Sequence, residues 1–197
     1  MTLLAVQGLG KSFGGVKANE DIVLAVQAGT VHSIIGPNGA GKTSLINMLS
    51  GVYRPDAGSI QLDGVELAGL PVHRFAAAGI GRTFQNLQVF FNMTVLENVM
   101  TGRHLREQVS LVASLLRLPS LVRAEQACRD NALRLLRVVG LAGQADAPAE
   151  SMPYGVLKRL EIARALAAEP KLLLLDEPAA GLNATEAHQI DSLIKTL

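Results

Sequence analysis

The sequence predicts an α/β fold, on three observations. An apolar, β-branched segment at residues 31–35 runs into a glycine-rich loop, and a segment with helical spacing, 43–49, follows the loop. Four consecutive leucines at 172–175 suit a strand of a parallel sheet that is buried on both faces. Asp176 and Glu177 come next, at the carboxyl end of that strand, where open α/β sheets place their ligand-binding groups.

The composition indicates a folded chain with a core of its own. Of its 197 residues 49% are hydrophobic and 18% are charged, which argues against disorder. The net charge of +1 gives no sign of nucleic-acid binding. The single cysteine, Cys128, rules out an internal disulfide and fits a reducing compartment. No signal peptide or bilayer-spanning run is visible, so we expect a chain that is soluble by itself.

The glycine-rich loop fits the phosphate-binding pattern G-x-x-x-x-G-K-[S/T] at every fixed position. Its three glycines lack a Cβ, so we expect positive φ angles and backbone N–H groups that curl around phosphate oxygens. Lys42 should reach the terminal phosphates, and the Thr43 hydroxyl should bind Mg²⁺. The alternative, a glycine-rich turn without a ligand, is disfavoured by the flanking strand and helix. The residues expected to hold the nucleotide here are Gly36, Pro37, Asn38, Gly39, Ala40, Gly41, Lys42, Thr43 and Ser44.

The N-terminal part is expected to consist mainly of strands, at residues 3–7 and 22–26, around a Gly-Gly turn. Phe13, just before that turn, could stack on a nucleotide base or cap a sheet edge, and its spacing leaves both possibilities open. Residues 59–67 predict a hairpin, because their central Asp-Gly pair suits a type I′ turn.

A short helix should follow the hairpin, with Pro71 at its first position and its end before Gly79. Residues 80–84 predict another short strand, which ends at Gln85.

Helical periodicity replaces the strands from residue 94 to residue 139. Thr94 and Glu97 form a capping box for the first helix. A second helix is expected at 109–118, and a third at 120–139 with Gly140 as its C′ residue. This block predicts a helical subdomain inserted between strands.

A linker at 143–153 leads to a strong helix at 154–168, which Pro170 halts. At the end of the leucine strand, Asp176 would hold Mg²⁺ largely through water, and Glu177 would act as general base on the attacking water. The alternative is a pair of acids that favours the dipole of the next helix. Asn183 and Glu186 can cap that helix, which runs to the end of the sequence.

Five segments carry a resemblance to one known family by their order and separation: residues 36–43, 82–86, 93–98, 154–166 and 174–183. The chain resembles the ATPase subunit of an ATP-binding cassette (ABC) transporter, and within that family the branched-chain amino-acid uptake ATPases of bacteria. The narrower resemblance rests on Pro-Tyr-Gly at 153–155 and on Ala-Ala-Gly-Leu-Asn at 179–183.

The resemblance implies roles for several residues. Phe13 falls at the aromatic position that stacks on adenine, and Gln85 matches the glutamine that senses Mg²⁺ and water. Residues 180–183 match a loop that crosses a dimer interface, and 86–97 resemble the groove that receives a coupling helix of a membrane subunit. Tyr154 and Gly155 would contact the ATP of the partner chain. The implied catalytic residues are Glu177, Gln85 and Lys42, and the implied metal ligands are Thr43, Gln85 and Asp176.

Two departures from the family pattern stand out. The signature Leu-Ser-Gly-Gly-Gln is here Met152-Pro153-Tyr154-Gly155-Val156, so a proline without a donor replaces the serine hydroxyl. The switch histidine of the family lies beyond the next strand after the paired acids, and the sequence ends at Leu197. His188 cannot substitute because it lies on the last helix, and His32, His73 and His104 have no partners at ligand spacing. We therefore expect a truncated chain, a partial gene product or an inactive paralogue.

The resemblance implies a single nucleotide-binding domain that is incomplete at its C-terminus. Residues 1–85 and 154–197 would form a P-loop NTPase core, with a parallel sheet and N-terminal antiparallel strands, and 86–153 the helical subdomain and linker. The function expected is ATP hydrolysis with Mg²⁺ that powers an importer for branched-chain or related amino acids.

The partners expected are a second ATPase chain, identical or related, and integral membrane permease subunits. No nucleic acid is expected, and the location would be cytoplasmic, peripheral on the inner face of the bacterial membrane. The main alternative is a switch that binds ATP without turnover. A P-loop kinase and a cassette ATPase that works on DNA are lesser alternatives, the latter disfavoured by the near-neutral charge.

Overall fold

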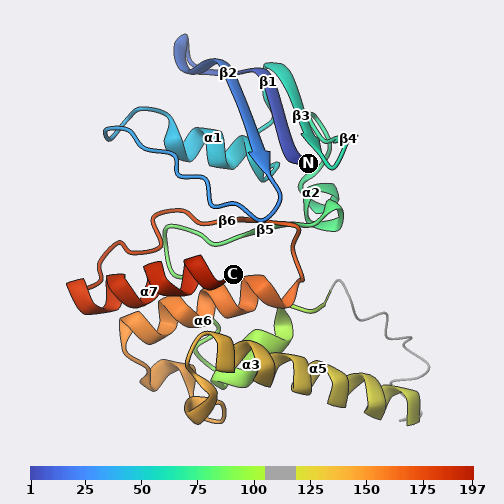
Figure 1. Ribbon diagram of the computed structural model, residues 1–197, viewed down its shortest axis with the longest axis vertical. Coiled ribbons are helices and arrows are strands. Elements are labelled where there is room, and N and C mark those ends of the chain that lie inside the picture. The colour runs from blue at the N-terminus through green and yellow to red at the C-terminus, as the bar shows by residue number, and fades with distance from the viewer. Residues whose placement is uncertain (105–118) are drawn as a thin grey trace. The chain divides into compact units, whose positions relative to one another are not determined.

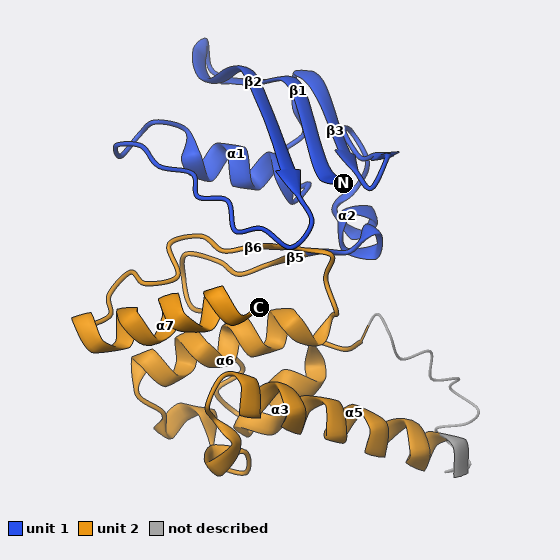
Figure 2. Cartoon of the chain, in the orientation of Figure 1, with its two compact units in different colours: residues 1–80 blue, residues 81–197 orange. Residues whose placement is uncertain are grey.

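The computed structural model describes residues 1–104 and 119–197. These residues form two compact units, Met1–Ile80 and Gly81–Leu197, which Figure 2 colours separately. Both units combine helices with strands, as predicted (Figure 1). The helix expected at 109–118 lies outside the described residues.

The first unit is built on a four-stranded sheet with the order β2-β1-β3-β4. Strands β1 (Thr2–Phe13) and β2 (Val16–Gln27) form a long antiparallel hairpin, and β3 (Ala57–Leu62) pairs antiparallel with β1. The hairpin is longer than predicted because its pairing continues through several register shifts. Apolar side chains alternate along β1 and β3 and form the core of the unit: Leu4, Val6, Leu9, Ile60 and Leu62.

Helix α1 (Lys42–Leu49) lies against β2 and buries its predicted inward side chains, Leu45, Ile46 and Leu49. The second hairpin is confirmed, since Asp63 and Gly64 join β3 to β4 (Val65–Glu66) with φ angles of 52° and 78°. Two positive φ angles in succession are what a type I′ turn requires.

Helix α2 (Val72–Ala78) ends as predicted at Gly79, whose φ is 106°. Pro71 is its N-cap residue and not its first helical residue, so the predicted start was wrong by one position.

The strand predicted at 31–35 is absent from both sheets of the described residues. Val31 is 66% exposed and Ile35 is 93% exposed. A β-branched run favours extended backbone, but a strand also needs a neighbour 4.7–4.9 Å away to share its hydrogen bonds. No pairing of the described strands includes these residues, so the segment that precedes the glycine loop is not part of a sheet.

The second unit has a short strand pair and a helical core. Strand β5 (Ile80–Arg82), in which the boundary of the units lies, pairs with β6 (Leu172–Leu174). Both strands are shorter than predicted, and only Leu174 of the four leucines is fully buried. The expectation of burial on both faces was therefore wrong, because a sheet of two short strands leaves its leucines partly uncovered.

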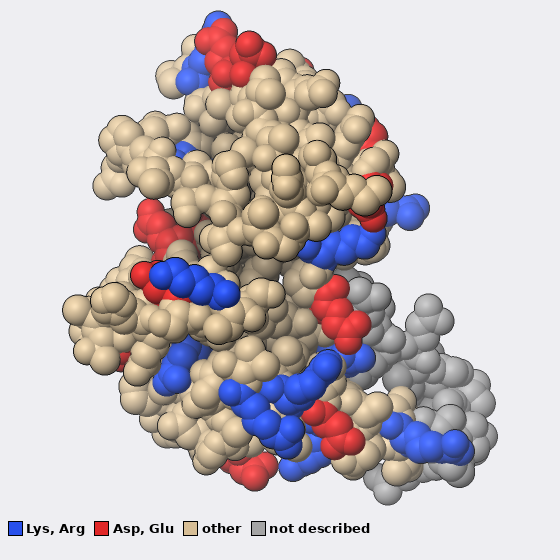
Figure 3. Space-filling model, in the orientation of Figure 1, with Lys and Arg blue, Asp and Glu red and all other residues tan. Residues whose placement is uncertain are grey.

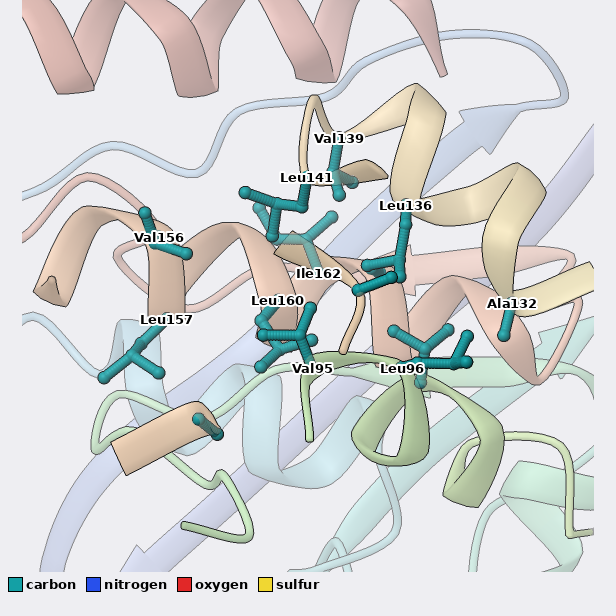
Figure 4. Close-up of a cluster of buried hydrophobic side chains, with 14 of the residues drawn as sticks. Val95, Leu96, Ala132, Leu136, Val139, Leu141, Val156, Leu157, Leu160 and Ile162 are labelled. Atoms are coloured by element: carbon teal, nitrogen blue, oxygen red, sulfur yellow. The ribbon is translucent and has the colours of Figure 1, made fainter. Parts of the chain in front are cut away.

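The helices of this unit are α3 (Val95–Thr101), α5 (Pro119–Val138), α6 (Tyr154–Ala167) and α7 (Ala184–Thr196), with 3₁₀ turns η1 (Ala142–Gln144) and η2 (Ala149–Ser151). Helix α6 packs against α3 and α5, and their apolar side chains meet in one cluster (Figure 4). Leu96, Leu136 and Leu160 contribute from three different helices, and each is at most 1% exposed. Within the described ranges, no helix has the length and apolar character needed to cross a membrane.

Three predicted helix ends in the second unit are confirmed. Thr94 accepts the backbone N–H of Glu97 at 3.1 Å, and the Glu97 carboxylate accepts the backbone N–H of Thr94 at 2.8 Å. The backbone and hydroxyl hydrogen bonds from Thr94 lower the pKa of Glu97. Asn183 caps α7 in the same way, and Gly140 follows α5 with a φ of 72°.

We expect Thr94→Ala to destabilise the second unit by about 1 kcal/mol, because the cap hydroxyl is lost. Urea unfolding followed by circular dichroism measures this. Thr101→Ala is the matched control in the same helix, since its hydroxyl only adds a bond to the Asn98 carbonyl. Equal losses for the two threonine variants would contradict the cap.

A second prediction concerns pH. The hydrogen bonds that lower the pKa of Glu97 stabilise the folded state at pH values above the unfolded pKa of this group. The difference in unfolding free energy between wild type and Glu97→Gln should therefore shrink as the pH falls through the folded pKa, which urea unfolding at a series of pH values measures.

Candidate functional site

The phosphate-binding loop leads into α1 in the first unit, as predicted. The Ala40 backbone N–H donates to the Pro37 carbonyl at 3.2 Å, and Gly39 has a φ of 82°. The Lys42 ammonium donates to the carbonyls of Gly36 and Pro37 at 2.7 and 2.9 Å. An ammonium group has three donors, so Lys42 is held at the loop and can still donate to a phosphate oxygen.

One glycine of the loop differs from expectation. Gly36 does not have a positive φ, although Gly39 and Gly41 do. A Cβ added at Gly36 would lie 3.3 Å from the Ala40 Cβ, so close packing is the constraint at this position and left-handed backbone is not.

Gly41 carries the strongest steric constraint of the loop. It is the N-cap residue of α1 with a φ of 81°, and a Cβ there would lie 2.3 Å from the Ala18 carbonyl oxygen. The buried Asn19 side chain donates its amide N–H to the Gly41 carbonyl at 3.3 Å. The sequence reasoning missed Asn19. An asparagine inside a strand is unfavourable for strand formation, and this was a usable signal.

Phe13 ends β1 with 43% of its surface exposed. Its ring contacts Tyr53 edge-on, with centroids 5.2 Å apart, and the Lys11 ammonium lies 5.5 Å from the ring centroid. Asp56 holds Lys11 through a 2.7 Å ion pair. The ring therefore packs on one neighbour and keeps surface free to stack on a base, which leaves both predicted roles open.

In the second unit, Asp176 follows β6 and is only 4% exposed. The Arg82 guanidinium lies 3.4 Å from its Oδ2 atom and 4.9 Å from the Phe84 ring centroid. A buried carboxylate is costly unless it is paired, and Arg82 supplies the compensating charge. The sequence gives no local signal for this ion pair, because 94 residues separate Arg82 from Asp176.

Gln85 and Glu177 are brought together although 92 residues separate them. The Gln85 amide donates to the Glu177 carboxylate at 3.4 Å, and both side chains are exposed. Glu177 has a φ of 48°, and its carbonyl accepts the Ala180 backbone N–H at 3.0 Å. A residue other than glycine is rarely held in this region, and such strain gathers at functional sites. An amide and a carboxylate side by side can orient a water molecule.

The altered signature begins α6. Pro153 is the N-cap residue, Tyr154 is 44% exposed and Gly155 is buried. A Cβ at Gly155 would lie 2.4 Å from Oε1 of Glu186, the acid that caps α7. A Cβ at Gly181 would lie 3.2 Å from the Tyr154 ring, so the signature and the loop at 180–183 are neighbours.

The structure thus distributes the predicted residues between the units. Phe13 and the loop residues 36–44 belong to the first unit, and the others belong to the second: Gln85, Tyr154, Gly155, Asp176 and Glu177. Within the second unit Gln85 meets Glu177, and Tyr154 lies beside Gly181.

The residues present fit ATP and Mg²⁺. In the loop, only glycine fits at position 41, and the Lys42 ammonium lies against the loop backbone. A compact glycine-containing loop with a positive charge is what a phosphate site needs. Mg²⁺ is usually held by one or two carboxylates together with phosphate and water, and Asp176, which also pairs with Arg82, is the candidate carboxylate. Among the described residues, no group of three His, Cys, Asp or Glu side chains could hold a metal alone.

The surface charges form a separate observation. Lys and Arg are interspersed with Asp and Glu over the described surface of Figure 3.

The chain is similar to known proteins of one family in sequence. The profile of the ABC transporter family matches residues 19–180. The chain is 43% identical over 195 residues to the high-affinity branched-chain amino acid transport ATP-binding proteins LivG of Salmonella typhimurium and BraF of Pseudomonas aeruginosa. Each match covers 99% of this chain and 76% of the relative. The probable LivG of Archaeoglobus fulgidus is 36% identical over 204 residues, which cover 96% of this chain and 73% of that protein.

Solved structures give the same result. The ADP conformation of MJ1267, an ATP-binding cassette of an ABC transporter, has a TM-score of 0.83 at 31% identity, and the match covers 100% of this chain and 76% of that one. A nucleotide-free ATP-binding cassette from an ABC transporter has the same TM-score at 32% identity, covering 100% and 77%. The predicted P-loop NTPase fold class is confirmed.

We expect Gly41→Ala to abolish binding of a fluorescent ATP analogue and to lower the Tm, because the new Cβ would clash with the Ala18 carbonyl. Gly39→Ala is the matched control, since its φ is nearly the same but its Cβ would meet open space. The control should cost about 1–2 kcal/mol from left-handed backbone alone. If the two variants had the same Tm and the same affinity, contact with Ala18 would not shape the loop.

Proposed function

The chain belongs to the ABC transporter family and is an ATPase of that family, and from this we propose that it powers an importer for branched-chain amino acids. The observation that carries the proposal is 43% identity to LivG and BraF over 99% of the chain. The solute itself is selected by other subunits of such a system, so the proposal covers related amino acids as well.

In the proposed reaction the loop at 36–44 binds the phosphates of ATP, and the Lys42 ammonium donates to their oxygens. The carbonyls of Gly36 and Pro37 already hold Lys42 at the loop, so little side-chain entropy is lost on binding. Thr43 and Asp176 would hold Mg²⁺, which neutralises the charge of the transferred phosphoryl group. Phe13 would stack on adenine.

Glu177 would accept a proton from the attacking water, and Gln85 would orient that water. The 3.4 Å contact between their side chains supports this division of roles. The N–H of the Gln85 amide can hold the Glu177 carboxylate while the amide oxygen accepts a hydrogen bond from water. The left-handed backbone of Glu177 also supports a functional role, because strained backbone of this kind gathers at functional sites.

We further propose that two chains, identical or related, close head to tail around ATP. Tyr154 and Gly155 at the start of α6 would face the nucleotide of the partner, where the N-terminal end of a helix favours phosphate. The loop at 180–183 lies beside Tyr154 and would cross the same interface. Pro153 contributes no donor, so this contact would rely on backbone groups.

A groove of about 420 Å³ in the second unit supports the proposed contact with membrane permease subunits. Three parts of the unit line the groove: the segment that follows β5, the end of helix α3, and helix α6. The groove overlaps the predicted docking stretch at 86–97. Phe90 is 46% exposed, and the Arg164 guanidinium lies 5.4 Å from its ring centroid. Burial lowers the pKa of Arg164, and the nearby Glu161 charge opposes that effect. Residues 86–153 would act as the helical subdomain that carries the contact, at the cytoplasmic face of the membrane.

The first test is ATP hydrolysis by the wild-type chain beside Glu177→Gln. We expect turnover to fall by about 10²–10⁴-fold in the variant while a fluorescent ATP analogue still binds, because the amide cannot accept the proton of water. Lys42→Ala is the companion variant, and it should lose binding as well as turnover.

Equal turnover in wild type and Glu177→Gln would remove Glu177 from the role of base. Binding of ATP without turnover in the wild-type chain would contradict the proposed activity and favour a nucleotide-dependent switch.

A further inference from the structure

Two opposite charges lie one turn apart on α6, and both are buried. Lys158 and Glu161 are each only 3% exposed, and their side-chain N and O atoms are 3.7 Å apart. Residues 155–157, 160, 162 and 163 of the same helix are buried too, so the two charges lie among buried neighbours. A buried pair of this kind needs further hydrogen bonds to offset the loss of water.

Glu161 finds those bonds in the backbone on either side of Gln85. Its Oε1 atom accepts the N–H of Phe84 at 3.3 Å and the N–H of Gln88 at 3.4 Å. Strand β5 ends at Arg82, and the Thr83 N–H donates to the Leu174 carbonyl at 3.0 Å. The segment 84–88 therefore begins just where strand pairing stops, and a carboxylate from α6 takes up two of its donors.

Lys158 binds a backbone carbonyl of the same segment. Its ammonium donates to the carbonyl oxygen of Gln85 at 3.3 Å and lies 5.7 Å from the Tyr154 ring centroid. Three backbone groups within five residues, two donors and one acceptor, are thus bound by one pair of charges. The helix that begins with Tyr154 and Gly155 is connected through this pair to Gln85.

We propose that Lys158 and Glu161 are positioning residues, named here the α6 clamp, which set the place of Gln85 beside Glu177. The inference rests on the proposed function, because Gln85 acts there on the attacking water. A shift of α6 when Tyr154 and Gly155 engage a nucleotide would move the clamp, and Gln85 would move with it. The clamp is the physical connection between the signature end of α6 and the general base.

The test compares three variants of the whole chain. Lys158→Met/Glu161→Met removes both charges at similar volume, which avoids leaving one buried charge unpaired. Gln85→Ala removes the positioned side chain itself. Arg159→Met is the matched control on α6, because Arg159 also donates to a backbone carbonyl at 3.3 Å, but to Val139 and away from the segment.

We expect the double methionine variant to lower kcat by about 10- to 100-fold, as misplacement of a reacting group does, with the KM for ATP within about twofold. The Mg²⁺ concentration that gives half of the maximal turnover should rise in the double variant, and we expect the same rise in Gln85→Ala. Combining the double variant with Gln85→Ala should add no further loss, because both act through one side chain. Arg159→Met should change the Tm without changing kcat or the Mg²⁺ dependence.

A structural role alone predicts another pattern, and that pattern would overturn the clamp. The double variant would then match Arg159→Met in kcat and Mg²⁺ dependence, or its loss would multiply with that of Gln85→Ala.

Hydrogen exchange at the Phe84 and Gln88 amides, measured by NMR, needs no turnover and separates the clamp from the proposed activity. Faster exchange at these two amides in the double variant supports the clamp, and unchanged exchange overturns it. Faster exchange together with normal turnover in Gln85→Ala would show that the segment is held but that Gln85 has no role in the reaction, which overturns the positioning of Gln85 and its proposed function.

Discussion

Buried side chains that bind loop backbone hold the site residues of this protein in place. Backbone groups that leave a strand or helix must find other partners when they are shielded from water. Glu161 meets this need for Phe84 and Gln88 in the second unit. In the first unit Asn19 adds a second hydrogen bond to the Gly41 carbonyl, which also accepts the Leu45 N–H at 2.9 Å. The geometry of the phosphate loop and of the Gln85 segment is therefore set by residues that would not themselves touch ATP.

Short-range signals in the sequence were reliable because their causes lie within a few residues. The capping box at Thr94, the type I′ turn at Asp63 and the glycine end of α5 each follow from local backbone chemistry. The phosphate loop and the paired acids could be located for the same reason, since their residue types and spacing are specific to phosphate chemistry.

Long-range pairing could not be predicted from the same signals. The segment 31–35 has the composition of a strand, but strand formation needs a neighbour that no local pattern supplies. Lys158 and Glu161 would normally indicate a solvent-exposed helical ion pair, yet both are buried. The signal that could have revealed them is the apolar residues on either side of both charges, at 156, 157, 160, 162 and 163, because such a run indicates a buried stretch of helix.

At Glu177 the left-handed backbone lowers the stability of the fold, while the side chain is the proposed general base. Glycine adopts a φ of 48° without steric cost, whereas glutamate pays about 1–2 kcal/mol for it. Selection for a robust fold alone would replace Glu177 by glycine or asparagine. A mutagenesis screen that scores only soluble expression or heat resistance would therefore favour exchanges at this position that remove the proposed general base, and should be paired with an activity screen.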